Sequence, residues 1–376
     1  MIKILFFIET LTGGGAEKVL QNLVNNMDSK KFDITVQTVW KENPEKYLNK
    51  NIKYKYIYPC YSKLNNYKYR LSVLLKTIYP LHIRDNYDIE VAYLECGATK
   101  VISTSTNKKA KKIAWVHCDL SKKISNINEF KKKSVKWYKN FDKVACVSRD
   151  VEKSFKSIYG NEFDTEVIYN VIDDCSIKEK ADENVGDYSF DKKIPTIVSV
   201  GRLSTEKRFD RLIEAHKALL DEGFLNKLLI IGEGDERKKL EQLIISLGVQ
   251  KTVTLLGFKG NPYPYIKNAD ILACSSDYEG FSSFVAEGII LGKAIVTTKC
   301  NGMEELLGSS QYGIITDTNV KAMSDGLKNL LSDKTLKAEY ETKAIERGKS
   351  FSIEASVKIN VKRITNGISL SSTSRK

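Results

Sequence analysis

Short apolar runs alternate with amphipathic stretches along almost the whole chain. In the first half, the apolar runs predict strands at 2–8, 32–39, 89–95, 112–117, 143–148 and 166–170. The stretches between them predict helices near 16–27, 66–79, 128–140 and 149–158. This alternation is typical of parallel βαβ units. We therefore expect an α/β domain with a doubly wound sheet.

A second series of the same kind follows a break in the pattern. Residues 173–194 are charged and poor in apolar side chains, which predicts a linker. Strands are then expected at 195–201, 227–234, 253–258, 270–276, 293–298 and 312–316, and helices at 207–221, 235–247, 281–291 and 319–331. We assign domains to 1–172 and 195–350, and we expect 351–376 to form a C-terminal helix and solvated tail packing on the first domain. Ligands of two such Rossmann-like domains should bind in a cleft at the carboxyl ends of the strands.

Length and composition support this division and exclude several classes of protein. The 376 residues suit two domains, and 42% hydrophobic with 28% charged residues exclude a disordered chain. No apolar run approaches the ~20 residues that cross a bilayer, and no signal peptide is evident, so we expect a cytoplasmic protein. Seven widely spaced cysteines without a C-x-x-C pair predict reduced thiols.

Positive charge is concentrated in the first half of the chain. The net charge is +13, and residues 100–149 alone hold fourteen Lys or Arg against three Asp or Glu. Residues 51–84 hold seven Lys or Arg, seven Tyr and no acidic residue. Nucleic acid, an anionic membrane surface or plain solvent could face such a surface. No recognisable nucleic-acid module accompanies it.

In each series, a glycine-containing loop follows the first strand. Gly13, Gly14 and Gly15 lie where a strand passes into a helix, a place where backbone N–H groups can approach an anion, although a plain tight turn is the alternative. In the second series, Arg202 and Lys207 stand five residues apart in one loop. Together they can neutralise a diphosphate without a metal, unless they are solvated surface cations.

The segment from Glu279 to Glu287 carries the strongest signal. A helix is predicted to begin with Ser282 or Ser283 as its N-cap, so that free N–H groups suit a sugar-linked phosphate. Both glutamates could then accept hydrogen bonds from hydroxyl groups. The alternative is an ordinary helix start with an exposed Glu. His117, at the carboxyl end of a predicted strand, is placed at the cleft, or else is a structural histidine.

The order of these motifs resembles retaining glycosyltransferases of family 4, also called group 1. It comprises the three glycines, Trp115-x-His117, Tyr169-Asn170-x-x-Asp173, Gly201-Arg202-x-x-x-x-Lys207, and Glu279 with Glu287. The resemblance covers about residues 1–330. It implies the GT-B fold, with an acceptor-binding first domain and a donor-binding second domain.

The resemblance also implies roles for individual residues. Arg202 and Lys207 would hold the diphosphate, Glu287 the ribose and Glu279 the transferred sugar. His117 would lie near the anomeric carbon, so that His117 and Glu279 are the candidate catalytic residues. The other candidate donor-binding residues are Gly14, Gly15, Phe281, Ser282 and Ser283. The chain contains no Asp-x-Asp, which disfavours a metal-bridged diphosphate and agrees with the metal-independent chemistry of the family.

These observations predict an enzyme that moves a sugar, from a UDP-sugar, to a lipid-linked or growing glycan acceptor in capsule or cell-wall synthesis. We expect no cofactor, no metal and no nucleic-acid partner. Because such acceptors lie in membranes, an anionic membrane surface is the favoured partner of the basic, tyrosine-rich segments, with peripheral association. The rival functions are a nucleotide-sugar epimerase of the same fold and a non-catalytic glycan-binding subunit.

Overall fold

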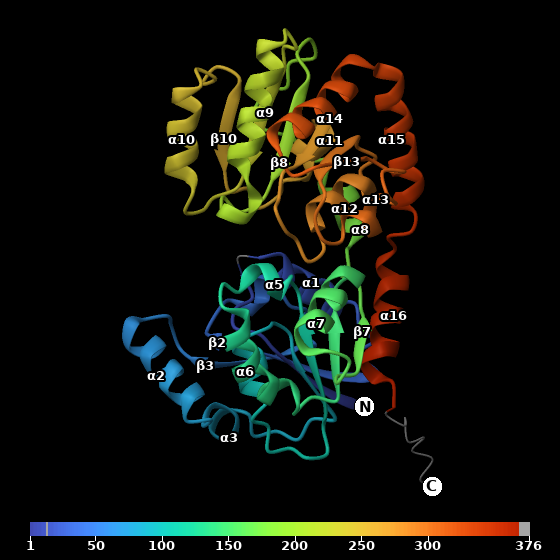
Figure 1. Ribbon diagram of the computed structural model, residues 1–376. Coiled ribbons are helices and arrows are strands. Elements are labelled where there is room, and N and C mark those ends of the chain that lie inside the picture. Colours follow the sequence, from blue (N-terminus) through green and yellow to red (C-terminus); the bar gives the residue numbers. More distant parts are fainter. Residues whose placement is uncertain (13, 368–376) are drawn as a thin grey trace. The chain divides into compact units, whose positions relative to one another are not determined.

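The computed structural model describes residues 1–12 and 14–367, which divide into two compact units. Unit 1 contains residues 1–171 and the chain from Ile353 onward, and unit 2 contains Ile172–Ser352. In both, strands lie side by side and helices cover the faces of the sheet (Figure 1). Gly13 and the expected solvated tail at 368–376 lie outside the described residues.

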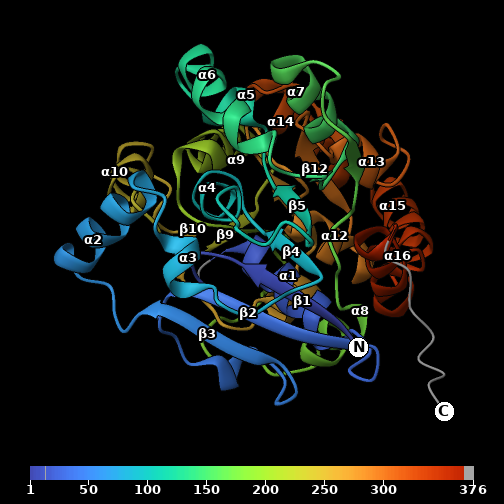
Figure 2. The same ribbon diagram turned by 90° about the horizontal axis from the view of Figure 1, so that it is seen from below.

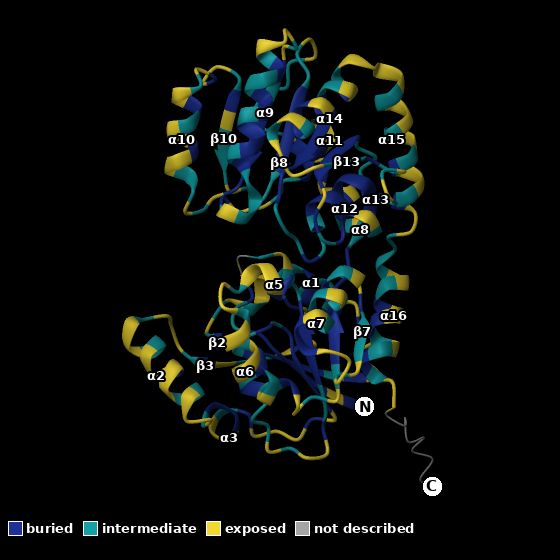
Figure 3. Ribbon diagram, in the orientation of Figure 1, coloured by how far each residue is buried: buried dark blue, intermediate teal, exposed yellow. Residues whose placement is uncertain are grey.

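Unit 1 is built on a seven-stranded parallel sheet in the order β3-β2-β1-β4-β5-β6-β7. Figure 2 shows β3, β2, β1, β4 and β5 of this sheet side by side. Its strands are β1 (Ile2–Phe7), β2 (Phe32–Trp40), β3 (Lys53–Tyr58), β4 (Ile89–Ala92), β5 (Lys111–Val116), β6 (Lys143–Cys146) and β7 (Thr165–Val167). Its helices are α1 (Gly15–Asn25), α2 (Lys63–Leu74), α3 (Ile78–His82), α4 (Gly97–Ile102), α5 (Leu120–Lys123), α6 (Ile127–Tyr138), α7 (Arg149–Tyr159) and α16 (Ile353–Thr365), with a 3-10 turn, η1 (Pro44–Lys46). The central strands are almost entirely buried, because helices cover a parallel sheet on both faces (Figure 3).

Unit 2 repeats this plan with six parallel strands in the order β10-β9-β8-β11-β12-β13. The strands are β8 (Thr196–Val200), β9 (Lys227–Ile231), β10 (Val253–Gly257), β11 (Ile271–Cys274), β12 (Ile295–Thr298) and β13 (Ile314–Thr316). The helices are α8 (Asp174–Lys180), α9 (Phe209–Asp221), α10 (Arg237–Ser246), α11 (Tyr263–Asn268), α12 (Ser283–Ile290), α13 (Met303–Leu307), α14 (Val320–Ser332) and α15 (Lys334–Gly348), with η2 (Thr205–Lys207). The predicted fold class, two Rossmann-like α/β units, is confirmed.

The strand order places two sequence-distant loops next to each other in each unit. The order reverses between β1 and β4 in unit 1, and between β8 and β11 in unit 2. Loops after these strand pairs leave in opposite directions, which opens a crevice at the carboxyl edge of the sheet. The residues that follow β8 and β11 are therefore the natural place for a ligand site in unit 2.

The segment expected to be a linker belongs to unit 2. Within residues 173–194, helix α8 packs against α11 and α12. Ile177 and Ala181 are buried in the core of the unit, and Tyr188 and Phe190 pack against it. Only a few apolar side chains make these contacts. The segment is therefore polar in composition although it is packed against the rest of the unit.

Helix α16 ends the described chain and belongs to unit 1, where it packs against α1. Asn360 Nδ2 donates a hydrogen bond to the carbonyl of Tyr169 (3.2 Å), and Arg363 lies 3.4 Å from Glu166. Among the described residues, no helix is both long and apolar enough to cross a bilayer, and the seven cysteines form no disulfide bond.

Candidate active site

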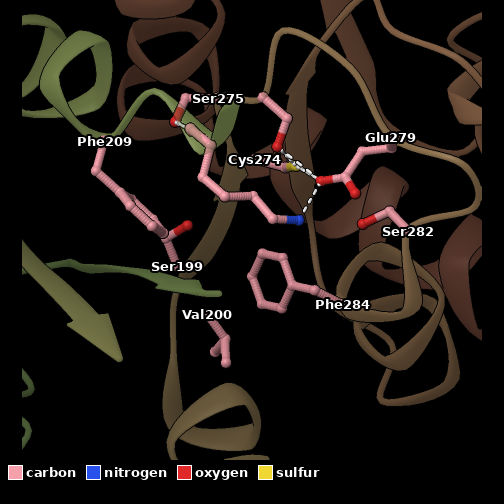
Figure 4. Close-up of a pocket in the computed structure, with 10 residues that line it drawn as sticks. Ser199, Val200, Phe209, Cys274, Ser275, Glu279, Ser282 and Phe284 are labelled. Atoms are coloured by element: carbon pink, nitrogen blue, oxygen red, sulfur yellow. Dashed lines mark hydrogen bonds and ion pairs between the residues drawn. The ribbon is translucent and has the colours of Figure 1, made fainter. Parts of the chain in front are cut away.

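A pocket in unit 2 lies at the strand reversal between β8 and β11. Figure 4 shows the side chains that surround it: Ser199, Val200, Lys207, Phe209, Cys274, Ser275, Ser276, Glu279, Ser282 and Phe284. They come from the ends of β8 and β11, from the loops after these strands, and from the start of α9 and α12. Three predicted site residues, Lys207, Glu279 and Ser282, thus meet at one place although they are far apart in sequence.

Lys207 and Glu279 form an ion pair at the centre of this pocket. Lys207 Nζ lies 2.6 Å from Glu279 Oε1, and Ser276 Oγ donates a hydrogen bond to the same oxygen at 2.7 Å. The side chains are 24% and 12% exposed, so a ligand can reach them. Burial lowers the pKa of Lys207, but the negative charge of Glu279 outweighs it and raises that pKa. The ammonium group is therefore charged at neutral pH.

Helix α12 begins beside this ion pair. Ser282 is its N-cap, and its hydroxyl accepts a hydrogen bond from the backbone N–H of Val285 (3.4 Å). Ser283 is the first helical residue, and Phe281 packs against the core of the unit. The first turn of a helix presents N–H groups with a partial positive charge, which suits a phosphate oxygen.

Glu287 lies one turn further along α12 and is only 6% exposed. Tyr263 OH, from α11, donates a hydrogen bond to Glu287 Oε1 at 3.1 Å. A buried carboxylate held by a tyrosine is a well-defined acceptor, unlike the exposed glutamate of an ordinary helix start. The structure therefore contradicts the exposed position of Glu287 in the alternative, and its contact with a ribose stays a prediction.

Arg202 is placed differently from Lys207. It is exposed and does not line the pocket, although it lies in the same loop. The sequence predicts that both cations hold one diphosphate, and the structure brings only Lys207 to Glu279.

In unit 1, His117 follows β5 and packs against two aromatic rings. Its ring centre is 4.9 Å from that of Tyr93 and 6.2 Å from that of Trp115, and the last pair is stacked. Burial lowers the pKa of His117 to about 4, so the imidazole is neutral at pH 7. Its Nε2 atom has no hydrogen-bond partner among the described residues.

A buried carboxylate that sequence reasoning did not single out holds this histidine in place. Glu95 lies between β4 and α4, and its Oε2 accepts a hydrogen bond from the backbone N–H of His117 (3.0 Å). Its Oε1 accepts from the Cys118 thiol (3.0 Å) and from Lys123 Nζ (2.8 Å). Burial alone would raise the pKa of Glu95, but Lys123 and His117 lower it to about 2. The available signal was its position at the carboxyl end of a predicted strand.

Gly14 and Gly15 stand at the start of α1 in unit 1. Gly14 is the N-cap residue in an extended conformation, and Gly15 is exposed. A Cβ atom on Gly14 would lie 2.4 Å from Glu17 Oε2, so a carboxylate already sits beside this helix start. The predicted approach of these glycines to a diphosphate stays a prediction. Within the described part of the chain, no three His, Cys, Asp or Glu side chains gather as around a metal ion.

Two relatives share part of their sequence with this chain. An N-acetylgalactosamine-N,N'-diacetylbacillosaminyl-diphospho-undecaprenol 4-alpha-N-acetylgalactosaminyltransferase of Campylobacter jejuni is 37% identical over 188 residues, which is 50% of this chain and 49% of the relative. A poly(ribitol-phosphate) alpha-N-acetylglucosaminyltransferase of Staphylococcus aureus is 25% identical over 188 residues, 50% of this chain and 37% of that protein. The chain therefore matches half or less of the length of these two relatives.

Solved structures match over nearly the full length. The Anabaena protein HepE, in complex with UDP-glucose, superposes with a TM-score of 0.77 at 18% identity, covering 97% of this chain and 100% of HepE. A point mutant of Staphylococcus aureus TarM, in complex with Fondaparinux, alpha-GlcNAc-glycerol and UDP, gives 0.75 at 13% identity, covering 97% and 100%. At such identities the likeness shows the fold, which is GT-B.

Family models account for both units. The Glycosyltransferase Family 4 model matches residues 13–174, and the model of glycosyl transferases group 1 matches residues 180–351. With both models matched in this order and with the GT-B fold, the chain belongs to the group 1 glycosyltransferases.

Proposed function

We propose that this protein transfers a sugar from a UDP-sugar to a lipid-linked or glycan acceptor, with retention of configuration and without a metal or cofactor. The observation that carries the proposal is the Lys207–Glu279 pair at 2.6 Å in the pocket where the strand order of unit 2 reverses. It sets a cation for a leaving diphosphate beside an acceptor for a sugar hydroxyl. Unit 2 is thus the donor-binding part, and unit 1 is assigned to the acceptor.

Each proposed role follows from the chemistry of the group. Lys207 and the N–H groups at the start of α12 stabilise the negative charge that grows on the diphosphate as the bond from the anomeric carbon breaks. Glu279 holds the sugar, and Glu287 with Tyr263 accepts the ribose hydroxyls. Arg202 adds positive charge at the same loop.

The bond to the anomeric carbon is formed and the bond to the diphosphate is broken on the same face of the sugar ring. The acceptor oxygen bonds to the anomeric carbon, the electron pair of the broken bond goes to the phosphate oxygen, and that oxygen takes the acceptor proton. No side-chain base is then required, which agrees with the lowered pKa of His117, about 4, because an imidazole with this pKa is a weak base. We propose that His117 contacts the transferred sugar.

The relatives support the choice of donor and acceptor. The name of the Campylobacter jejuni protein specifies a diphospho-undecaprenol acceptor, and that of the Staphylococcus aureus transferase a poly(ribitol-phosphate) acceptor. The HepE structure contains UDP-glucose, and the TarM structure contains UDP. Capsule or cell-wall glycan synthesis is the process that fits such acceptors.

The test is release of nucleoside diphosphate from a panel of nucleotide sugars, with and without membrane extract and in excess chelator. We expect one UDP-sugar to be consumed faster with extract, chelator to have no effect, and the product to keep the anomeric configuration in its NMR spectrum. Conversion of the donor into another nucleotide sugar without UDP release would instead identify an epimerase. Loss of turnover in chelator, restored by manganese, would refute the metal-independent mechanism.

We also propose that unit 1 binds an anionic membrane through one face of α2. This α2 surface consists of exposed apolar residues flanked by exposed cations: Tyr61, Leu64, Tyr67, Leu71, Leu74 and Leu75, with Lys63, Lys68, Arg70 and Lys76. Tyr69 and Val73 pack inward instead and attach the helix to the unit. Apolar residues at helical spacing between cations suit an interface with anionic lipid, and residues 51–84 contain no acid to oppose it.

Vesicle sedimentation tests this surface. We expect binding to vesicles with anionic lipid, weaker binding at high salt, and loss of binding when Leu64, Leu71 and Leu74 are changed to Ser. A matched triple change of the exposed leucine and isoleucines of unit 2, Leu225, Ile245 and Ile345, to Ser should leave binding unchanged. Equal binding of the α2 triple variant and the wild type would show that the membrane does not contact this surface.

A further inference from the structure

The loops that carry Lys207 and Glu279 are tied together behind the pocket. Ser275 Oγ donates a hydrogen bond to the carbonyl of Lys207 (2.8 Å), and the backbone N–H of Asp277 donates to the carbonyl of Glu206 (2.8 Å). These bonds link the segment before α9 to the segment after β11. The two segments would otherwise be separate loops on neighbouring strands.

Two arginines at the start of α9 reinforce this link through one carboxylate. Arg208 Nη1 donates to Asp277 Oδ2 (3.1 Å), and Arg211 Nη2 donates to Asp277 Oδ1 (2.5 Å). Arg211 is 4% exposed, and its Nη1 also donates to the carbonyl of Ser275 (2.8 Å). Both oxygens of Asp277 are thus bound from α9, so the loop after β11 cannot shift without breaking a charged contact.

Arg208 makes this contact from an unfavourable backbone conformation. Its φ of +50° lies in the left-handed region, which costs free energy for any residue with a Cβ and would suit glycine. Its guanidinium also binds Asp210, with Nε 3.0 Å from Oδ1 and Nη2 2.9 Å from Oδ2. Specific side-chain contacts that offset such strain indicate that the position of this residue matters for the site.

We propose that Arg208, Asp277 and Arg211 form a clasp that positions Lys207 against Glu279 for the donor. Arg208 directly follows Lys207 in the chain, and Asp277 precedes Glu279 by two residues. The clasp therefore acts on both catalytic-site side chains through their backbones, and its members are positioning residues. The inference rests on the proposed function of the pocket. A misplacement of about 1 Å in such a site can reduce the rate as much as 100-fold.

The decisive variant is Arg208→Gly, because it removes the contact of Arg208 with Asp277 and relieves the backbone strain at once, while Arg211 keeps its contact with Asp277. We expect kcat/KM for the donor to fall at least tenfold, the acceptor KM to stay the same, and the thermal unfolding midpoint to stay within about 2 °C of the wild type. Asp277→Asn weakens the contacts with both arginines and should lose at least as much. The double variant should be no worse than Asp277→Asn alone, because the contact between Arg208 and Asp277 is then already weakened.

Asp210→Asn is the matched control. It removes a carboxylate from the same arginine but leaves the contact between Arg208 and Asp277. We expect kcat/KM within twofold of the wild type. The clasp is refuted if Arg208→Gly keeps kcat/KM within twofold of the wild type, or if Asp210→Asn loses as much as Arg208→Gly.

Failure of the clasp can be distinguished from failure of the proposed function. If the wild type releases UDP from no sugar donor, the transferase proposal fails, and calorimetric titration with UDP then decides on the clasp. In that case Arg208→Gly should bind UDP at least fivefold more weakly than Asp210→Asn, and equal affinities would refute the clasp.

Discussion

Replacing Glu95 by Gln should destabilise unit 1 in a pH-dependent way. The pKa of this carboxyl falls from its usual 4.5 to about 2 because Lys123 and His117 outweigh burial. At about 1.4 kcal/mol per pH unit, the ionised carboxylate stabilises the folded unit by about 3 kcal/mol. Because the folded pKa is depressed, this stability is present above pH 4.5 and is lost as the pH falls toward 2. By pH 3, about 2 kcal/mol of it should be gone.

Tryptophan fluorescence during urea unfolding measures this effect selectively. All three tryptophans of the chain, Trp40, Trp115 and Trp137, lie in unit 1. We expect the wild type to exceed Glu95→Gln in stability by about 3 kcal/mol at pH 7, and the difference to shrink steadily between pH 5 and pH 3. A difference that stays constant across this range would refute the reasoning, because it would mean that the charge of Glu95 contributes nothing.

Glu90→Gln is the matched control, on β4, the strand that precedes Glu95. Glu90 is fully buried and accepts a hydrogen bond from Tyr79 OH, and burial raises its pKa. Its ionisation therefore opposes folding as the pH rises through the unfolded pKa. The wild type should gain stability relative to Glu90→Gln on acidification, which is the opposite trend to that of Glu95→Gln.

The remaining predictions concern the donor pocket. Glu287→Gln should weaken UDP binding about tenfold or more in calorimetry, because a hydrogen bond to a charged group contributes about 1.5–3 kcal/mol. Glu279→Gln should bind UDP as tightly as the wild type or more tightly, since Lys207 loses its competing partner, but it should transfer sugar more slowly; equal loss of UDP affinity in both variants would refute separate ribose and sugar roles. Lys207→Met should weaken the binding of UDP more than the binding of UMP, which lacks the second phosphate. Equal weakening of both would place Lys207 away from the diphosphate.

Local sequence pattern determined most of the secondary structure, because buried parallel strands appear as apolar runs and helices as amphipathic stretches. The strand at Lys53–Tyr58 escaped notice although Lys and Tyr alternate there with a period of two. As an edge strand, it carries charged residues in place of the uniform apolar run that marked the central strands. Helix α8 escaped for a related reason, since only a few of its apolar side chains pack inward.

Motif order in the sequence was also enough to nominate Lys207, Glu279, Glu287 and His117, since each follows or begins a recognisable element. Only the tertiary structure decided which of them meet. Neighbouring β8 and β11 bring Lys207 to Glu279, while Arg202 remains exposed outside the pocket. The contacts of Glu95 and of the arginines at the start of α9 could not be predicted, because their partners lie 22 to 69 residues away. Such contacts depend on strand order and loop geometry, and no local pattern records them.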